Sequence, residues 1–251
     1  YGTVVNAARG VAMQVNNIVR QMYSSFQTPC RPQVMKYYAA GEIKEMQALI
    51  CNNSKYCSYL LLCVIIPLTI NIDGLLEIWL VEVPEYTVAF VRFIFAVSFV
   101  NAMTDPVAMG IQATGNVKRL NVIIASINAL VVGAAYLLFY LGFSPISCYI
   151  PVLISCIINM AIHLYLLHNI VSFDVHIFIS KVIIPVAKFT VICLIAPVVL
   201  YLVIPHNAIG CICSTILAGC SVALIIFVFA LPKHLKTMIV EKIIKLAKHG
   251  N

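Results

Sequence analysis

Six segments of the chain are continuous apolar runs that are long enough to cross a lipid bilayer as helices. A hydrocarbon core about 30 Å thick is crossed by roughly 20 helical residues. The runs that meet this length are residues 54–73, 86–111, 120–142, 148–171, 182–204 and 208–231. Because they are continuous rather than alternating between apolar and polar residues, they predict transmembrane helices and not the strands of a barrel.

A seventh segment, residues 4–27, has helical periodicity but is polar along one side. Together the seven segments fill residues 1–231 and predict one transmembrane lobe of about seven helices. Only 10% of the residues are charged, whereas soluble domains carry about 25%. This composition excludes a water-soluble domain of this length, so that the sequence predicts an all-α integral membrane protein.

Lysine and arginine are distributed unequally between the two ends of the predicted helices. The lysine-rich side receives residues 28–53, 112–119 and 172–181 and the segment after Pro232. The opposite side receives residues 74–85, 143–147 and 205–207, which contain no Lys or Arg. By the positive-inside rule, the lysine-rich side is expected to be cytoplasmic. Topology therefore explains the net charge of +7, which does not indicate nucleic-acid binding.

The C-terminal segment, residues 232–251, alternates Lys with Ile, Leu and Met. This pattern predicts a basic amphipathic helix that lies on anionic membrane lipids at the cytoplasmic surface. A solvated terminus without regular structure is the alternative interpretation.

The ten cysteines do not indicate a metal or disulfide site. Most of them lie within the apolar runs, among them Cys57, Cys63, Cys156, Cys193 and Cys220, and there Cys behaves as a small hydrophobic residue. Cys211 and Cys213 form a C-x-C pair, but no second ligand pair stands at zinc spacing. The chain also lacks a nucleophile elbow, a phosphate-binding loop and a paired-carboxylate motif. The sequence therefore predicts neither a metal, nor a cofactor, nor an enzyme.

The segment from Val4 to Gln27 carries the most informative polar residues. Seven of them fall within one sector of about 100° on a helical wheel: Asn6, Arg9, Asn16, Asn17, Arg20, Ser24 and Gln27. An arginine that faces lipid at the bilayer centre costs at least about 2.5 kcal/mol. Arg9 and Arg20 are therefore expected to face a water-filled cavity. A surface amphipathic helix, or arginines paired with acidic residues from outside this chain, are the alternatives.

The chemistry of this polar face suits a phosphorylated and glycosylated ligand. A guanidinium binds pairs of phosphate oxygens through its planar fork of donors. Asparagine side chains offer donors and acceptors for sugar hydroxyls. We therefore predict that Asn6, Arg9, Asn16, Asn17 and Arg20 form a substrate-binding surface.

The run 86–111 contains a second polar face, on which Asn101 and Asp105 lie. A carboxylate at membrane depth is a candidate site for a coupling proton or sodium ion. Because Asp105 directly precedes Pro106, a role in stabilising a helix kink is the equal alternative. Arg92 lies on the other side of this run and is expected to extend to the outer membrane interface.

Three segments resemble polysaccharide export proteins of the Wzx type. They are VVNAARGVAMQVNNIVRQMYSSFQTPCRPQVMKYYAAGEIKEM (residues 4–46), LLEIWLVEVPEYTVAFVR (75–92) and IQATGNVK (111–118). Wzx flippases belong to the multidrug/oligosaccharidyl-lipid/polysaccharide superfamily. The resemblance implies a two-lobed transporter, related in architecture to the multidrug and toxin extrusion proteins, of which this chain would be the C-terminal lobe. It also implies that Arg9, in Ala7-Ala8-Arg9, faces a central cavity as the matching arginine of lipid II flippases does.

The leading functional hypothesis that follows from this resemblance is translocation of an undecaprenyl-diphosphate-linked oligosaccharide across the bacterial inner membrane, for O-antigen or capsule biosynthesis. The expected partners are this lipid-linked substrate, the membrane lipids and an N-terminal lobe of the same protein that the chain, which opens at Tyr1, does not contain. A drug or cation antiporter of the same superfamily is the first alternative. A membrane enzyme of polysaccharide assembly is the second.

Overall fold

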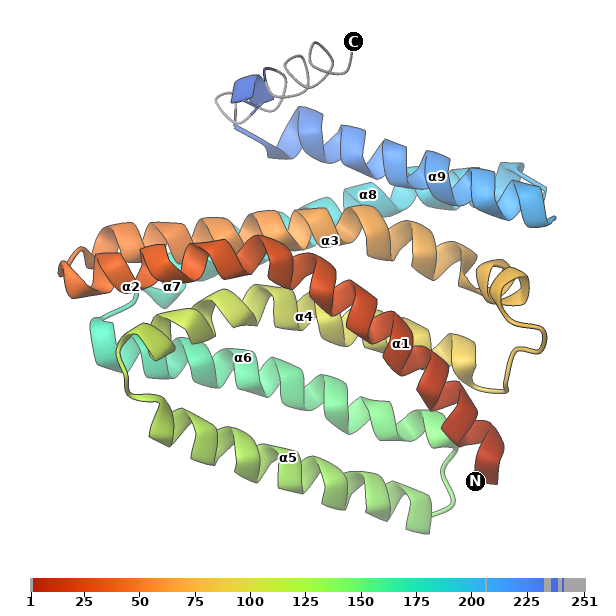
Figure 1. Cartoon of the computed structure of the whole chain (residues 1–251), viewed down its shortest axis with the longest axis horizontal. Coiled ribbons are helices and arrows are strands. Elements are labelled where there is room, and N and C mark those ends of the chain that lie inside the picture. The colour runs from red at the N-terminus through yellow and green to blue at the C-terminus, as the bar shows by residue number, and fades with distance from the viewer. Residues whose placement is uncertain (1, 206, 233–235, 239–240, 242–251) are drawn as a thin grey trace.

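The computed structural model describes residues 2–205, 207–232, 236–238 and 241, and within these residues all regular structure is helical (Figure 1). Six helical segments are long and apolar enough to cross a membrane: Ile43–Trp79, Thr87–Ala113, Val117–Tyr140, Pro145–Val171, Val175–Val203 and Ala208–Ala230. The amphipathic N-terminal helix adds a seventh long helix. The chain is an all-α, multi-pass membrane protein, as predicted.

The elements follow one another with short connections. The α-helices are α1 (Gly2–Gln27), α2 (Arg31–Ala39), α3 (Ile43–Trp79), α4 (Thr87–Ala113), α5 (Val117–Tyr140), α6 (Tyr149–Val171), α7 (Val175–Phe178), α8 (Ile184–Val203) and α9 (Ala208–Ile225). Tight 3₁₀ turns at Thr28–Cys30 and Pro145–Cys148 precede α2 and α6, and π-helical turns at Ile179–Ile183 and Ile226–Ala230 extend α8 and α9.

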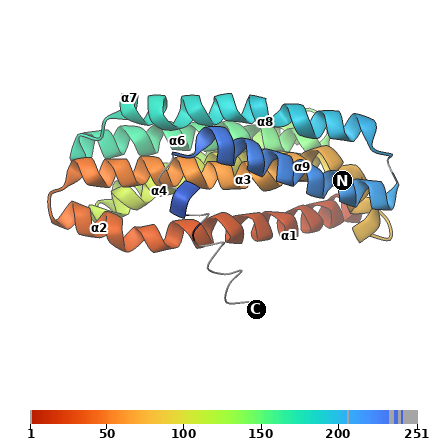
Figure 2. The same ribbon diagram turned by 90° about the horizontal axis from the view of Figure 1, so that it is seen from above.

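Helices α3 and α4 form the centre of the bundle. Helices α8 and α9 pack on α3, whereas α1 and α6 pack on α4. Figures 1 and 2 show α1 crossing α4 on one outer side of the molecule and α8 lying on the opposite side. One hydrophobic cluster joins α3, α6 and α8 around Leu167 and Phe178, and a second joins α1, α3 and α4 around Phe90 and Phe95.

Helix α5 lies at the edge of the bundle beside α6 (Figure 1). Leu120 is the one buried residue of this helix. Large apolar side chains such as Leu130 and Tyr136 are more than two-thirds exposed. Such exposure is compatible with a helix surrounded by lipid, because lipid tails are as apolar as the side chains that face them.

Pro106 interrupts the hydrogen bonding of α4, and side chains from neighbouring helices compensate. Pro106 has no N–H to donate to Ala102 O, and Gln27 Nε2 donates to this carbonyl at 2.8 Å. The next carbonyl, Met103 O, accepts from Ser54 Oγ at 2.9 Å. Since hydrocarbon offers no water as a substitute, these contacts hold α1 and α3 to the proline turn of α4.

Asn71 of α3 connects the turn after Pro67 to α9. Its Nδ2 donates to Pro67 O at 3.1 Å, and its Oδ1 accepts from Ser214 Oγ at 2.8 Å. The same amide therefore stabilises α3 and attaches α9 to it.

Helix α3 differs most from its expected span, because it begins at Ile43 and not near residue 54. Hydropathy identifies only the part of a helix that lies in lipid. The polar residues before residue 54 continue α3 outside the hydrocarbon core, so that hydropathy does not detect them as part of the helix. With 37 residues, α3 is about 55 Å long, well beyond the 30 Å core. The predicted amphipathic helix over residues 232–251 lies largely outside the described residues.

Candidate functional site: a two-sided cavity beside α1

Helix α1 packs on α4 along a seam of small and buried residues. Ala8, Ala12, Val19 and Tyr23 of this seam are each at most 2% exposed. The seam runs along the border between the polar and apolar faces of the helix rather than through the apolar face. As a result, polar residues flank one side of the α1–α4 contact, and exposed apolar residues such as Ile18 flank the other.

The polar side opens into a cavity of about 800 Å³ between α1, α4, α5 and α6. Its α1 wall contains Gly2, Val5, Asn6, Arg9, Met13 and Asn16. The remaining walls are apolar and aromatic, with Phe90, Ile94 and Val97 of α4, Val131, Val132, Ala135, Tyr136 and Phe139 of α5, and Pro145, Cys148, Tyr149 and Val152 before and within α6. The cavity is therefore polar on one side and apolar on the others.

Among the described residues that line this cavity, Arg9 is the one that carries a charge. Cys148 and Tyr149, at the start of α6, line the same cavity. Among the residues that the structure describes, no carboxylate forms an ion pair with Arg9. The cavity thus presents a positive charge to a ligand without a competing internal anion.

The amide of Asn16 is fixed by a contact with α4. Ser98 Oγ donates to Asn16 Oδ1 at 3.2 Å. Asn6 and Arg9 lie toward the N-terminal end of α1, and Asn16 lies about two turns further along the same wall. Three of the five predicted substrate-binding residues, Asn6, Arg9 and Asn16, are therefore brought together on one cavity wall.

Arg20 and Asn17 are placed differently. Both are exposed, and neither is among the residues that line the cavity. Arg20 and Tyr23 are instead neighbours of Asp105 on α4, with no ion pair between Arg20 and this carboxylate among the described residues. Since Arg9 and Arg20 are about 16 Å apart along α1, the two arginines belong to separate polar sites.

The candidate ion-coupling residues, Asp105 and Asn101, are both half-buried on α4. Asp105 shares its environment with Arg20 and Tyr23, whereas Asn101 lies one turn before it. Gln27 and Ser54 donate to backbone carbonyls of the proline turn. A contribution of Asp105 to the stability of this turn stays a prediction.

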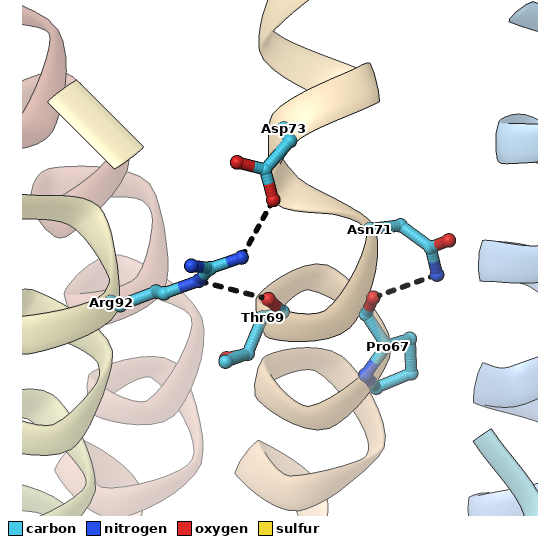
Figure 3. Close-up of polar contacts among 5 residues, drawn as sticks. All are labelled: Pro67, Thr69, Asn71, Asp73 and Arg92. Atoms are coloured by element: carbon cyan, nitrogen blue, oxygen red, sulfur yellow. Dashed lines mark hydrogen bonds and ion pairs between the residues drawn. The ribbon is translucent and has the colours of Figure 1, made fainter. Parts of the chain in front are cut away.

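Arg92 forms an ion pair that sequence reasoning missed (Figure 3). Its Nη2 lies 2.6 Å from Asp73 Oδ2, and its Nε donates to Thr69 O at 3.4 Å. Asp73 lies six residues before the end of α3, and Arg92 lies five residues after the start of α4. In consecutive antiparallel helices, residues at similar distances from the connecting loop lie at the same depth. Counting residues outward from the loop would therefore have predicted the pair.

Comparison of the chain with protein-family models, with curated proteins and with solved structures finds no match.

Proposed function

We propose that the chain forms part of a bacterial inner-membrane flippase that moves an undecaprenyl-diphosphate-linked oligosaccharide from the cytoplasmic to the periplasmic leaflet. The observation that carries this proposal is the cavity beside α1, in which Arg9 and two asparagine amides face apolar and aromatic walls. A lipid-linked oligosaccharide has the same division between a charged polar end and a hydrocarbon end.

In this proposal the diphosphate binds to Arg9, whose paired donors match phosphate oxygens. Asn6 and Asn16 contact hydroxyls of the adjoining sugar, because amides both donate and accept. The apolar side chains of α5, which is exposed at the edge of the bundle, accommodate the beginning of the polyprenyl chain. The N-terminal lobe implied by the resemblance would complete the transport pathway.

A drug or cation antiporter is less compatible with this cavity. Its described lining residues include Arg9 and no Asp or Glu, so that the local field repels a cationic cargo. A membrane enzyme requires reactive groups positioned around a substrate. The described lining residues include the Cys148 thiol but no His, Asp or Glu to activate it.

The proposal is tested by complementing a flippase-deficient bacterium with the gene that encodes this chain. Arg9→Ala is expected to reduce surface polysaccharide by at least tenfold, because a charge-assisted hydrogen bond contributes about 1.5–3 kcal/mol. Arg9→Lys is expected to retain part of the display, since it keeps the charge and loses the planar fork. Polysaccharide is measured by immunoblotting at matched protein levels.

Arg31→Ala is the matched control. Arg31 is an exposed arginine at the start of α2, away from the cavity, and its replacement is expected to leave display unchanged. Full display by the Arg9→Ala protein would contradict the proposed role of the cavity.

A further inference from the structure

The face of α1 that points away from α4 carries a regular stripe of small and polar residues, here called the outer stripe. All of its members are exposed: Thr3, Ala7, Gly10, Gln14, Asn17 and Gln21. They follow one another in alternating steps of four and three residues, the spacing at which two helices pack along a common line. On a helical wheel the outer stripe lies about 180° from the buried seam that packs on α4. None of its members is among the described residues that line the cavity containing Arg9.

The outer stripe lies at the depth of the membrane. Ser98, near the middle of the membrane-spanning helix α4, donates a hydrogen bond to Asn16, so that the neighbouring Asn17 lies close to the centre of the bilayer. Among the described helices, α1 is not one of those that are apolar enough to cross a membrane. Amide side chains that face hydrocarbon have no water with which to exchange hydrogen bonds. The outer stripe therefore requires a cover other than lipid.

The composition of the outer stripe suits another transmembrane helix as this cover. Ala7 and Gly10 allow two backbones to approach closely, and Asn and Gln side chains hydrogen-bond across helix pairs in membranes. A Cβ added at Gly10 meets no atom within 4 Å in the single chain, so that the space in front of this residue is open. Figure 2 shows α1 along an outer edge of the bundle, where a second helix has access. A surface in contact with water alone would require neither the small residues nor the regular spacing.

The chemistry of the outer stripe indicates that the second helix is a copy of α1. Copies of one chain insert into the membrane in the same orientation, so that a twofold axis along the bilayer normal relates two of them and each stripe residue faces its own counterpart. Such a residue must be complementary to itself. Amides and hydroxyls meet this requirement because they donate and accept, and small residues meet it by their size. The outer stripe contains no charged residue, although Arg9 and Arg20 lie on the same helix, and like charges beside the axis would repel each other.

We propose that the outer stripe binds a second copy of this chain, so that two α1 helices pair in parallel within the membrane. Gln14, Asn17 and Gln21 exchange amide hydrogen bonds with their counterparts, and the two backbones approach most closely at Gly10. The cavity that contains Arg9 lies to one side of the outer stripe, so that the twofold axis places the two cavities on opposite sides of the α1 pair. The pairing is independent of what the cavities bind.

Single-molecule photobleaching of the full chain in dilute lipid vesicles, with one fluorophore on each chain, tests this pairing. The unsubstituted chain is expected to bleach in two steps. Gly10→Leu is expected to weaken dimerisation about tenfold, because overpacking a close contact is costly. Gly133→Leu is the matched control, since Gly133 is an exposed glycine of α5 at which an added Cβ also meets open space. It is expected to leave dimerisation unchanged, as is Arg9→Ala, which separates the pairing from the proposed flippase function.

Disulfide cross-linking locates the contact. In a protein with its own cysteines replaced, oxidation by copper phenanthroline is expected to join two Asn17→Cys chains, as each thiol loses a proton and gives an electron to the oxidant. Ile18→Cys is the matched control, because Ile18 is also exposed but lies about 100° further around α1, and it is expected not to cross-link. Single-step bleaching of the unsubstituted chain, equal effects of the Gly10 and Gly133 variants, or cross-linking of Ile18→Cys in place of Asn17→Cys would each overturn the proposal.

Discussion

Arg9 and Arg20 lie on the same face of α1 and yet have different surroundings. Neither arginine forms an ion pair among the described residues, but Arg9 lines a cavity without described acidic residues, whereas Arg20 lies near Asp105 and Tyr23. Electrostatic interactions in a medium of low dielectric are strong, so that the neighbour of a charge determines its role. The charge of Arg9 is available to a ligand, whereas we expect the charge of Arg20 to favour the ionised form of the nearby Asp105 carboxylate.

This assignment predicts energetic coupling between Arg20 and Asp105. Arg20→Ala is expected to destabilise the protein because it leaves the half-buried carboxylate of Asp105 uncompensated. Asp105→Asn removes that carboxylate, so that adding Arg20→Ala to it is expected to cost about 1 kcal/mol less than Arg20→Ala alone. The four proteins are compared by their free energies of unfolding in detergent. Strictly additive effects would show that the two charges do not interact.

At the scale of the helices, the proline turn of α4 is the point at which three elements meet. Pro106 removes one backbone donor, and side chains from α1 and α3 supply donors to the carbonyls beside it. Gln27, which the helical wheel placed on the polar face of α1, is only 1% exposed because it serves this function. The last turn of α1 is thereby held on α4, while the first turns of α1 remain beside the cavity.

Replacing Gln27 by Leu is therefore expected to destabilise the bundle by about 1–2 kcal/mol, because Ala102 O then lacks a donor in a water-free environment. In a Pro106→Ala background, residue 106 regains its N–H and can donate to Ala102 O itself. Gln27→Leu is then expected to cost less than half as much. Thermal unfolding of the four proteins measures this difference. An equal cost in both backgrounds would mean that Gln27 stabilises α1 in another way.

At the scale of the whole molecule, the two ends of the bundle differ in charge and in their inter-helix contacts. One end carries the lysine-rich loops and α2. The other carries Glu77, Glu82 and Glu85, and near it Arg92 is paired with Asp73. Because Arg92 is paired with an aspartate, it does not change the difference in charge between the two ends, and the positive-inside rule still predicts that the lysine-rich end is cytoplasmic.

Cysteine accessibility tests this topology. In a protein with its own cysteines replaced, Lys118→Cys and Glu82→Cys are expected to react with a membrane-impermeant maleimide from opposite sides of the membrane. Residues of 28–53 and 232–251 are expected to label from the same side as Lys118→Cys. Labelling of both test positions from one side of intact cells or inverted vesicles would exclude the arrangement.

The sequence by itself determined the class of the protein and the nature of its helices, because length and hydropathy depend on local composition. Continuous apolar runs identify membrane helices whatever their neighbours are, and the periodicity of residues 4–27 places Arg9 on a polar face without knowledge of the partner helix. Local composition also explains where the sequence is uninformative. Helix α3 begins at Ile43, before the apolar run, and hydropathy does not predict this part of the helix because its residues are polar.

Only the tertiary structure decided how the polar residues are grouped. A helical wheel gives Arg9 and Arg20 equivalent positions, but α4 brings Asp105 to Arg20, and α5 and α6 enclose space beside Arg9. The donors for the proline turn and the Asp73–Arg92 pair likewise depend on contacts between separate helices. The physical reason is that hydrogen bonds and charges act between neighbours in space, and the packing of the seam on α1 determines which neighbours these are.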